Sequence, residues 1–337
     1  MAIQHSYSPL VRSHRPLRTV LIGTLLGEDS DDLVRAGLEV ARAAGARVHL
    51  VHAAEVQLQH VGFDIGSGPV VDHDQIVQLT GELNRQVQRL GIQPQELDGA
   101  EVRVGSPHRI LTQVASQIGA DLIVVGATGF GPFAAELLGS TADRVLRQAV
   151  CPVLVVRGEL RIPPRTVLAP VDLSTLSGDA FHCGLHLLGQ IGGGETRVQA
   201  VYALSFLDAL AARKRNGESV PLEQVEKAAG DELHRFVLEN RPDVPVHVDC
   251  AVLSGDARAE ILRTADEQPV DLVVLGSHGR SGLDRLMLGS VASTVARKAP
   301  CSVLVISPEA ALSEGIAAAV ESQTSPAWHG EPAGVSS

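Results

Sequence analysis

Two copies of one glycine pattern lie 150 positions apart in this chain of 337 residues. In each copy a short apolar run ends in a glycine, a second glycine follows after two residues, and a Gly-Ser pair follows nine residues later. Glycine lets a backbone approach a bound group closely, and the free N–H groups at a helix start favour an anion. The pattern therefore predicts a strand, a glycine loop and a helix that together cradle an anion, built twice. The residues are Gly126, Gly129, Gly139 and Ser140 in the first copy, and Gly276, Gly279, Gly289 and Ser290 in the second.

The similarity between the copies extends beyond the glycines. Residues 121–159 and 271–309 are identical at 17 of 39 positions without a gap, which indicates duplication. Two units of about 150 residues have the commonest domain size. We expect a flexible N-terminus (1–16), a first domain (17–158), a linker (159–164), a second domain (165–308) and a disordered tail (309–337). The tail contains one weak helical run, at 310–320.

The strands read as apolar runs without alternation, which is typical of a parallel sheet covered by helices on both faces. Amphipathic stretches at 31–44, 72–90 and 107–118 predict helices between the strands of the first copy. The alternation predicts two doubly wound α/β domains of Rossmann-like or flavodoxin-like type, whose ligands bind beyond the carboxyl ends of the strands. The expected strands are 18–24, 47–53, 101–104, 121–126 and 152–156, then 165–170, 197–204, 246–252, 271–276 and 302–306.

Composition limits the location and the partners. Apolar residues make up 45% of the chain and charged residues 20%, as in soluble proteins, and neither a membrane span nor a signal peptide is visible, so we expect a cytoplasmic protein. The formal net charge of −11 disfavours nucleic acid, which needs clustered Lys and Arg. The four cysteines show no Cys-x-x-Cys spacing, which favours structural thiols.

The second glycine copy carries a family resemblance. The stretch GSHGRSGLDRLMLGSV at 276–291 resembles the signature of the universal stress protein family, and the resemblance covers most of residues 18–308. It implies a tandem member whose domains each have a five-stranded sheet of order 3-2-1-4-5. It also implies pairing between the final strands, so the two halves should form a pseudo-dimer within one chain. A further dimer between chains is left open.

One branch of that family binds ATP, and the resemblance transfers an ATP site, with or without Mg²⁺, to the second half. Asp172, at the end of the first strand, is the leading candidate for the adenosine end, and the Gly-Ser pair would surround the phosphates. An unidentified protein partner would read the nucleotide state. The full set is Pro170, Val171, Asp172, Ala203, Leu275, Gly276, Gly279, Arg280, Gly289, Ser290 and Val291.

The first copy departs from this pattern. Leu25 stands where the second copy has Asp172, and Thr128 and Phe130 replace His278 and Arg280. We therefore expect a degenerate cradle with weaker selectivity for an adenine nucleotide. It would consist of Gly126, Gly129, Gly139, Ser140 and Thr141.

Simpler explanations compete with these assignments. The glycines can be required for a backbone with positive φ or for tight packing, and the serines can be ordinary N-caps. Asp172 can cap the next helix, and His278 can be a solvated loop residue. Five histidine and aspartate residues, which are of types that can bind metals, lie close together in the sequence. Their spacing fits no fixed metal signature, and the aspartates are explained by the helix dipole at a helix start. The group comprises His60, Asp64, Asp72, His73 and Asp74.

Three classes of function remain at this level. The favoured one is a stress-response regulator that presents different surfaces with and without ATP. The second is an adaptor that binds no nucleotide. The third is an enzyme that hydrolyses ATP slowly, which is disfavoured because neither a Gly-x-Ser-x-Gly elbow nor a Walker sequence is present.

Overall fold

The structure is a computed structural model, and it describes residues 16–55, 73–127, 138–213, 220–279 and 288–311. The described strands form one ten-stranded sheet in the order β3-β2-β1-β4-β5-β10-β9-β6-β7-β8. Numbered within each half, the order is 3-2-1-4-5, and all pairs within a half are parallel. The strands are β1 (Thr19–Gly23), β2 (Arg47–Ala54), β3 (Leu97–Val104), β4 (Leu122–Gly126), β5 (Val153–Val156), β6 (Thr166–Val171), β7 (Arg197–Leu204), β8 (His247–Ser254), β9 (Leu272–Gly276) and β10 (Ser302–Ile306).

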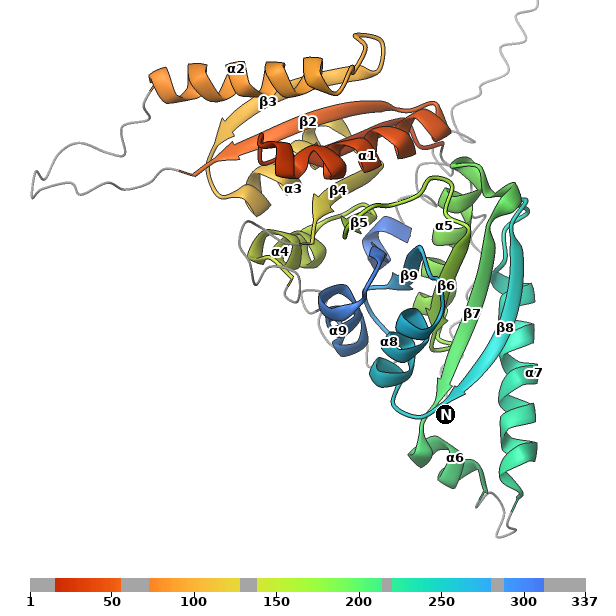
Figure 1. Cartoon of the computed structure of the whole chain (residues 1–337). Coiled ribbons are helices and arrows are strands. Elements are labelled where there is room, and N and C mark those ends of the chain that lie inside the picture. The colour runs from red at the N-terminus through yellow and green to blue at the C-terminus, as the bar shows by residue number, and fades with distance from the viewer. Residues whose placement is uncertain (1–15, 56–72, 128–137, 214–219, 280–287, 312–337) are drawn as a thin grey trace, which may run out of the picture.

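Helices cover both faces of the sheet (Figure 1). One hydrophobic core lies under α1, α2, α5 and α7, the other lies under α3, α4, α8 and α9, and each core includes residues of both halves. The expected doubly wound α/β architecture is confirmed. The helices are α1 (Asp31–Ala44), α2 (His73–Arg89), α3 (Pro107–Ile118), α4 (Ser140–Gln148), α5 (Thr175–Gln190), α6 (Phe206–Arg213), α7 (Leu222–Asn240), α8 (Ala257–Glu267) and α9 (Ser290–Lys298), with short 3-10 turns η1 (Glu28–Ser30) and η3 (Gly193–Glu195).

The two halves meet at their final strands. β10 pairs antiparallel with β5, Leu304 opposite Leu154, so these apolar edges cover each other instead of facing solvent. This is the intrachain pairing that the sequence analysis expects. Polar contacts flank it: the Arg157 guanidinium donates to the carbonyls of residues 296 and 297 at 3.2 and 3.1 Å, and Arg297 reaches Asp143 at 2.9 Å.

The edge strands differ from the prediction that every strand is buried on both faces. Most residues of β3 and β8 are partly or fully exposed, because each lies at an end of the sheet and has a single neighbouring strand. β3 also begins four residues earlier than predicted, at Leu97. Its Gly99 lies under the imidazole of His49, where a Cβ would collide with the ring.

Several sequence predictions fall outside the described residues. These are the N-terminal residues before Pro16, the helical run beyond Ala311 and most of the histidine and aspartate group. Within that group only His73 and Asp74 are described, at the start of α2. Among the described residues, none of the helices combines the length and the apolar composition that a membrane crossing requires.

Candidate functional site

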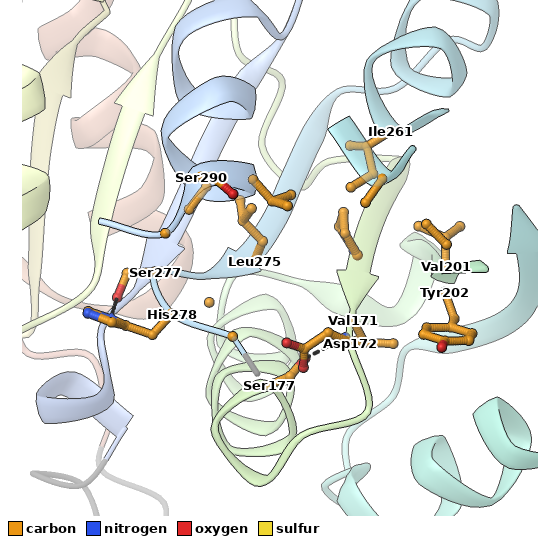
Figure 2. Close-up of a pocket in the computed structure, with 18 residues that line it drawn as sticks. Val171, Asp172, Ser177, Val201, Tyr202, Ile261, Leu275, Ser277, His278 and Ser290 are labelled. Carbon is orange, nitrogen blue, oxygen red and sulfur yellow. Dashed lines mark hydrogen bonds between the residues drawn. The ribbon is translucent and has the colours of Figure 1, made fainter. Parts of the chain in front are cut away.

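A cavity of about 310 Å³ lies at the carboxyl ends of β6, β7 and β9 in the second half, against the N-terminus of α9 (Figure 2). This is where a doubly wound sheet binds its ligands. Every residue of the transferred ATP set that the structure describes lines the cavity; Arg280 lies outside the described residues. The lining members of the set are Pro170, Val171, Asp172, Ala203, Leu275, Gly276, Gly279, Gly289, Ser290 and Val291.

Asp172 follows β6 and is held in place by its neighbours. Oδ1 of Asp172 accepts hydrogen bonds from the Ser174 N–H at 3.0 Å and from the Ser174 hydroxyl at 2.6 Å. The backbone N–H of Asp172 donates to Ser177 Oγ at 3.2 Å. The side chain that caps α5 is Ser174, which accepts from the N–H of Ser177. The explanation of Asp172 as the helix cap is therefore wrong: the carboxylate supports the capping serine while facing the cavity (Figure 2).

The glycines of the second copy are needed for close approach and not for backbone conformation. Gly276, Gly279 and Gly289 do not have a positive φ, so that explanation is wrong for them. A Cβ at Gly279 would collide with Oδ2 of Asp172, and one at Gly289 would lie 3.0 Å from the carbonyl oxygen of Ser277. Tight packing thus accounts for all three residues, and Gly279 brings the loop backbone against the carboxylate.

The Gly-Ser pairs begin helices, but the serines are not N-caps. The N-caps are Gly139 for α4 and Gly289 for α9, and neither helix has a side-chain cap. Gly289 is fixed by a 2.8 Å hydrogen bond from its N–H to the Ser277 carbonyl, and Gly139 by a 2.7 Å bond to Ala127. A helix start without a side-chain cap leaves N–H groups for an anion, with the helix dipole behind them.

An apolar wall completes the second-half cavity, and sequence reasoning missed most of it. Val201 and Tyr202 come from the end of β7, and Ala257 and Ile261 come from α8. Strand and helix patterns predict that such residues are buried, but only tertiary packing brings them to the glycine loop. The described lining residues include neither Lys nor Arg, and among them the start of α9 is the feature that favours an anion.

The sequence allows His278 to be a solvated loop residue, but the structure leaves it only partly exposed. Its Nδ1 lies 2.7 Å from the hydroxyl of Ser277, and its Nε2 is buried with no hydrogen-bond partner in the described part of the chain. The ring points away from Asp172 (Figure 2). The contact with Ser277 fixes the orientation of the ring.

The first half has its own cavity at the equivalent place, and it is larger, at about 560 Å³. Of the predicted degenerate cradle, Gly126, Gly139, Ser140 and Thr141 line it, while Gly129 lies outside the described residues. Leu25 also lines it.

Backbone conformation supports the alignment that places Leu25 where the second half has Asp172. The next residues, Leu26 and Leu173, have φ of 70° and 65°, and the structure gives a positive φ to no other described residue except glycines. Side chains seldom adopt this conformation, so a shared instance marks the same turn in both halves.

Neither cavity is accompanied by a protein-built metal site: the described residues contain no group of three or more His, Cys, Asp or Glu side chains able to hold an ion. Mg²⁺ is commonly bound through one or two carboxylates together with substrate phosphates. Asp172 is the one carboxylate among the described lining residues, and it follows β6 rather than lying at the start of α9, so an Mg²⁺ ion here would arrive with the nucleotide and be held by its phosphates.

Comparison with known proteins identifies the family. The model of the universal stress protein family matches residues 16–157 and 164–307, so the chain belongs to that family and carries its domain twice. Universal stress protein Rv2005c of Mycobacterium tuberculosis is 30% identical over 218 residues, which cover 61% of this chain and 68% of that protein.

Two solved structures extend the comparison. A universal stress protein from Archaeoglobus fulgidus aligns with 87% of this chain and all of its own, with a TM-score of 0.58 and 20% identity, a likeness of fold. A universal stress protein solved in complex with cAMP is 25% identical, covers 42% of this chain and 98% of its own, and has a TM-score of 0.32.

Proposed function

We propose that this protein is a nucleotide-dependent regulator of the stress response, and that it binds ATP mainly in its second half. The observation that carries the proposal is the position of Asp172, a carboxylate held at the end of β6 on the wall of a cavity that also contains an uncapped helix start. The first half has the helix start but a leucine in place of the carboxylate.

The adenosine end of ATP fits the side of the cavity formed by β6 and β7. Oδ1 of Asp172 is already engaged by Ser174, and Oδ2 faces Gly279, so the carboxylate is oriented before a ligand arrives. A fixed carboxylate accepts hydrogen bonds from a ribose diol without first having to be ordered. The apolar side chains of Val201, Leu275 and Ile261 suit the faces of an adenine ring.

The phosphates fit the other side, at the start of α9. Gly289 and Ser290 begin this helix, and the hydroxyl of Ser290 adds a donor to the backbone N–H groups. Figure 2 shows Ser290 and Asp172 approaching the pocket from different elements. This arrangement separates an anion-binding end from a carboxylate end, as a nucleotide with a neutral ribose and charged phosphates requires.

A role in regulation follows from what the site contains. The described lining residues provide a binding surface but include neither Lys nor Arg, the side chains that neutralise developing charge in rapid phosphoryl transfer. Nucleotide binding, rather than fast turnover, is therefore the event on which the proposed regulation depends. The partner that reads the bound state is unassigned.

The test is calorimetry on the full chain with ATP. Asp172→Ala removes hydrogen bonds to a charged group, which are worth about 1.5–3 kcal/mol, so ATP affinity should fall roughly 10- to 150-fold. Leu25→Ala changes the equivalent position of the first half and is the matched control, with no expected effect. No ATP binding by the folded wild type would favour the adaptor interpretation, and equal affinity in wild type and Asp172→Ala, with both proteins folded by thermal melt, would show that Asp172 does not hold the nucleotide.

A further inference from the structure

The cavity of the first half has a composition that points to a different ligand. We propose that it binds a small amphipathic molecule with an aromatic or acyl body and a single anionic head. It would thus be a second ligand site, distinct in chemistry from the nucleotide site proposed for the second half. The proposal depends on the first-half residues alone and is independent of whether ATP binds elsewhere.

The first argument is the size and the walls of this cavity. At about 560 Å³ it lies within the usual range of small-molecule sites and exceeds the second-half cavity of about 310 Å³. Aliphatic side chains from several elements or their ends form much of its wall, among them Leu25 after β1, Leu33 from α1, Val51 from β2 and Leu111 from α3. Such a surface gains more from an apolar body than from a sugar.

The second argument is Leu25. It occupies the position of Asp172, and its side chain is 45% exposed at the cavity although the preceding Thr24 and the following Leu26 are buried. The Leu25 side chain itself supplies no hydrogen-bond acceptor. A ribose at this position would therefore meet an aliphatic side chain in place of the Asp172 carboxylate, while an apolar group would cover Leu25.

The third argument is the charge around the cavity. Asp29 and Asp32 line it from the first helical turns, and Asp32 is paired with Arg35 at 2.9 Å. Arg157 lines it from the end of β5 while donating to the carboxyl end of α9. The pairing with Arg35 offsets the charge of Asp32, so the Arg157 guanidinium can attract one anionic group, while Asp29 repels the further charges of a triphosphate.

The experiment uses 8-anilinonaphthalene-1-sulfonate, an aromatic molecule with one sulfonate, as a fluorescent probe of the full chain. We expect one probe site per chain, displaced by decanoate and not by ATP. Leu25→Asp should weaken probe binding about tenfold or more, because the probe would press an apolar ring against a carboxylate. Leu25→Met, which keeps the aliphatic surface, should bind as the wild type does.

Two controls make the outcome decisive. Phe206 is 76% exposed on α6 and is the alternative surface for an apolar probe, so Phe206→Ser should leave binding unchanged. Leu33→Gln changes the cavity from α1, away from the turn that follows β1, and should weaken binding like Leu25→Asp. The proposal is overturned by unchanged binding in both cavity variants, by loss of binding in Phe206→Ser, or by displacement of the probe with ATP.

Discussion

Gly279→Ala tests whether the loop glycine serves the carboxylate of Asp172. A Cβ at this position would collide with Oδ2, so either the loop or the carboxylate must move. Asp172 is restrained because its Oδ1 accepts two hydrogen bonds from Ser174. If the carboxylate moves, the loss of one such bond lowers the free energy of unfolding by about 1.5–3 kcal/mol. At about 2–4 °C per kcal/mol, the melting temperature should fall by about 3–12 °C.

A double-mutant cycle separates this collision from a general loss of stability. In an Asp172→Ala background, Gly279→Ala should have almost no further effect on the melt, because the atom it collides with is gone, and the coupling energy should equal the effect of the single variant. Gly194→Ala is the control, because a Cβ there meets nothing within 4 Å. Additive effects of the two changes, or a Gly279→Ala protein with unchanged melting and ATP affinity, would refute the reasoning.

Three further predictions concern the contacts beside the β5–β10 pair, where the two halves meet, and the buried thiol of Cys151. Arg157→Met removes both hydrogen bonds to the carboxyl end of α9 and should lower the free energy of unfolding by about 1.5–3 kcal/mol in chemical denaturation, with Arg157→Lys less affected. Burial raises the pKa of Asp143, but hydrogen bonds from Arg147 and Arg297 outweigh it and hold the pKa below its usual value. The contribution of the Asp143 carboxylate to the free energy of unfolding is therefore complete above about pH 5 and is lost as the pH falls below about 4. Asp143→Asn should flatten that part of the curve of unfolding free energy against pH. An unchanged curve would contradict the contact between Asp143 and Arg297. Burial raises the pKa of the Cys151 thiol to about 12, so iodoacetamide at pH 8 should modify it only after denaturation; rapid modification of the native protein would contradict its buried position.

Local patterns predicted the first three helices of the first half well. α1 and α3 begin and end where the apolar spacing places them, and each ends at a left-handed glycine, Gly45 and Gly119. The start of β3 was missed because residues 97–100 include Asp98 and Gly99, which are poor strand formers. Pairing with β2 overrides that preference, and the His49 ring occupies the space that Gly99 leaves free.

The candidate site was only half predictable. Glycine spacing is a local feature, and the family resemblance supplied the carboxylate at the strand end, so Asp172 and Gly289 could be assigned to one cavity before the structure was known. Tyr202 and Ile261 could not, since they reach the loop only through the packing of β7 and α8. The sequence also predicted a weakened first cradle, but the size of its cavity depends on how α1 and α3 pack and has no local signal.

The central claim is that ATP occupies the second half of the chain. It is tested most directly by labelling the full-length protein with 8-azido-ATP and mapping the modified peptides by mass spectrometry. The account predicts labelling near the adenine end of the second-half cavity, around Ala203 at the end of β7, with protection by unlabelled ATP and loss in Asp172→Ala. Protected labelling of peptides from the first half, around Leu25 or Val51, would contradict it.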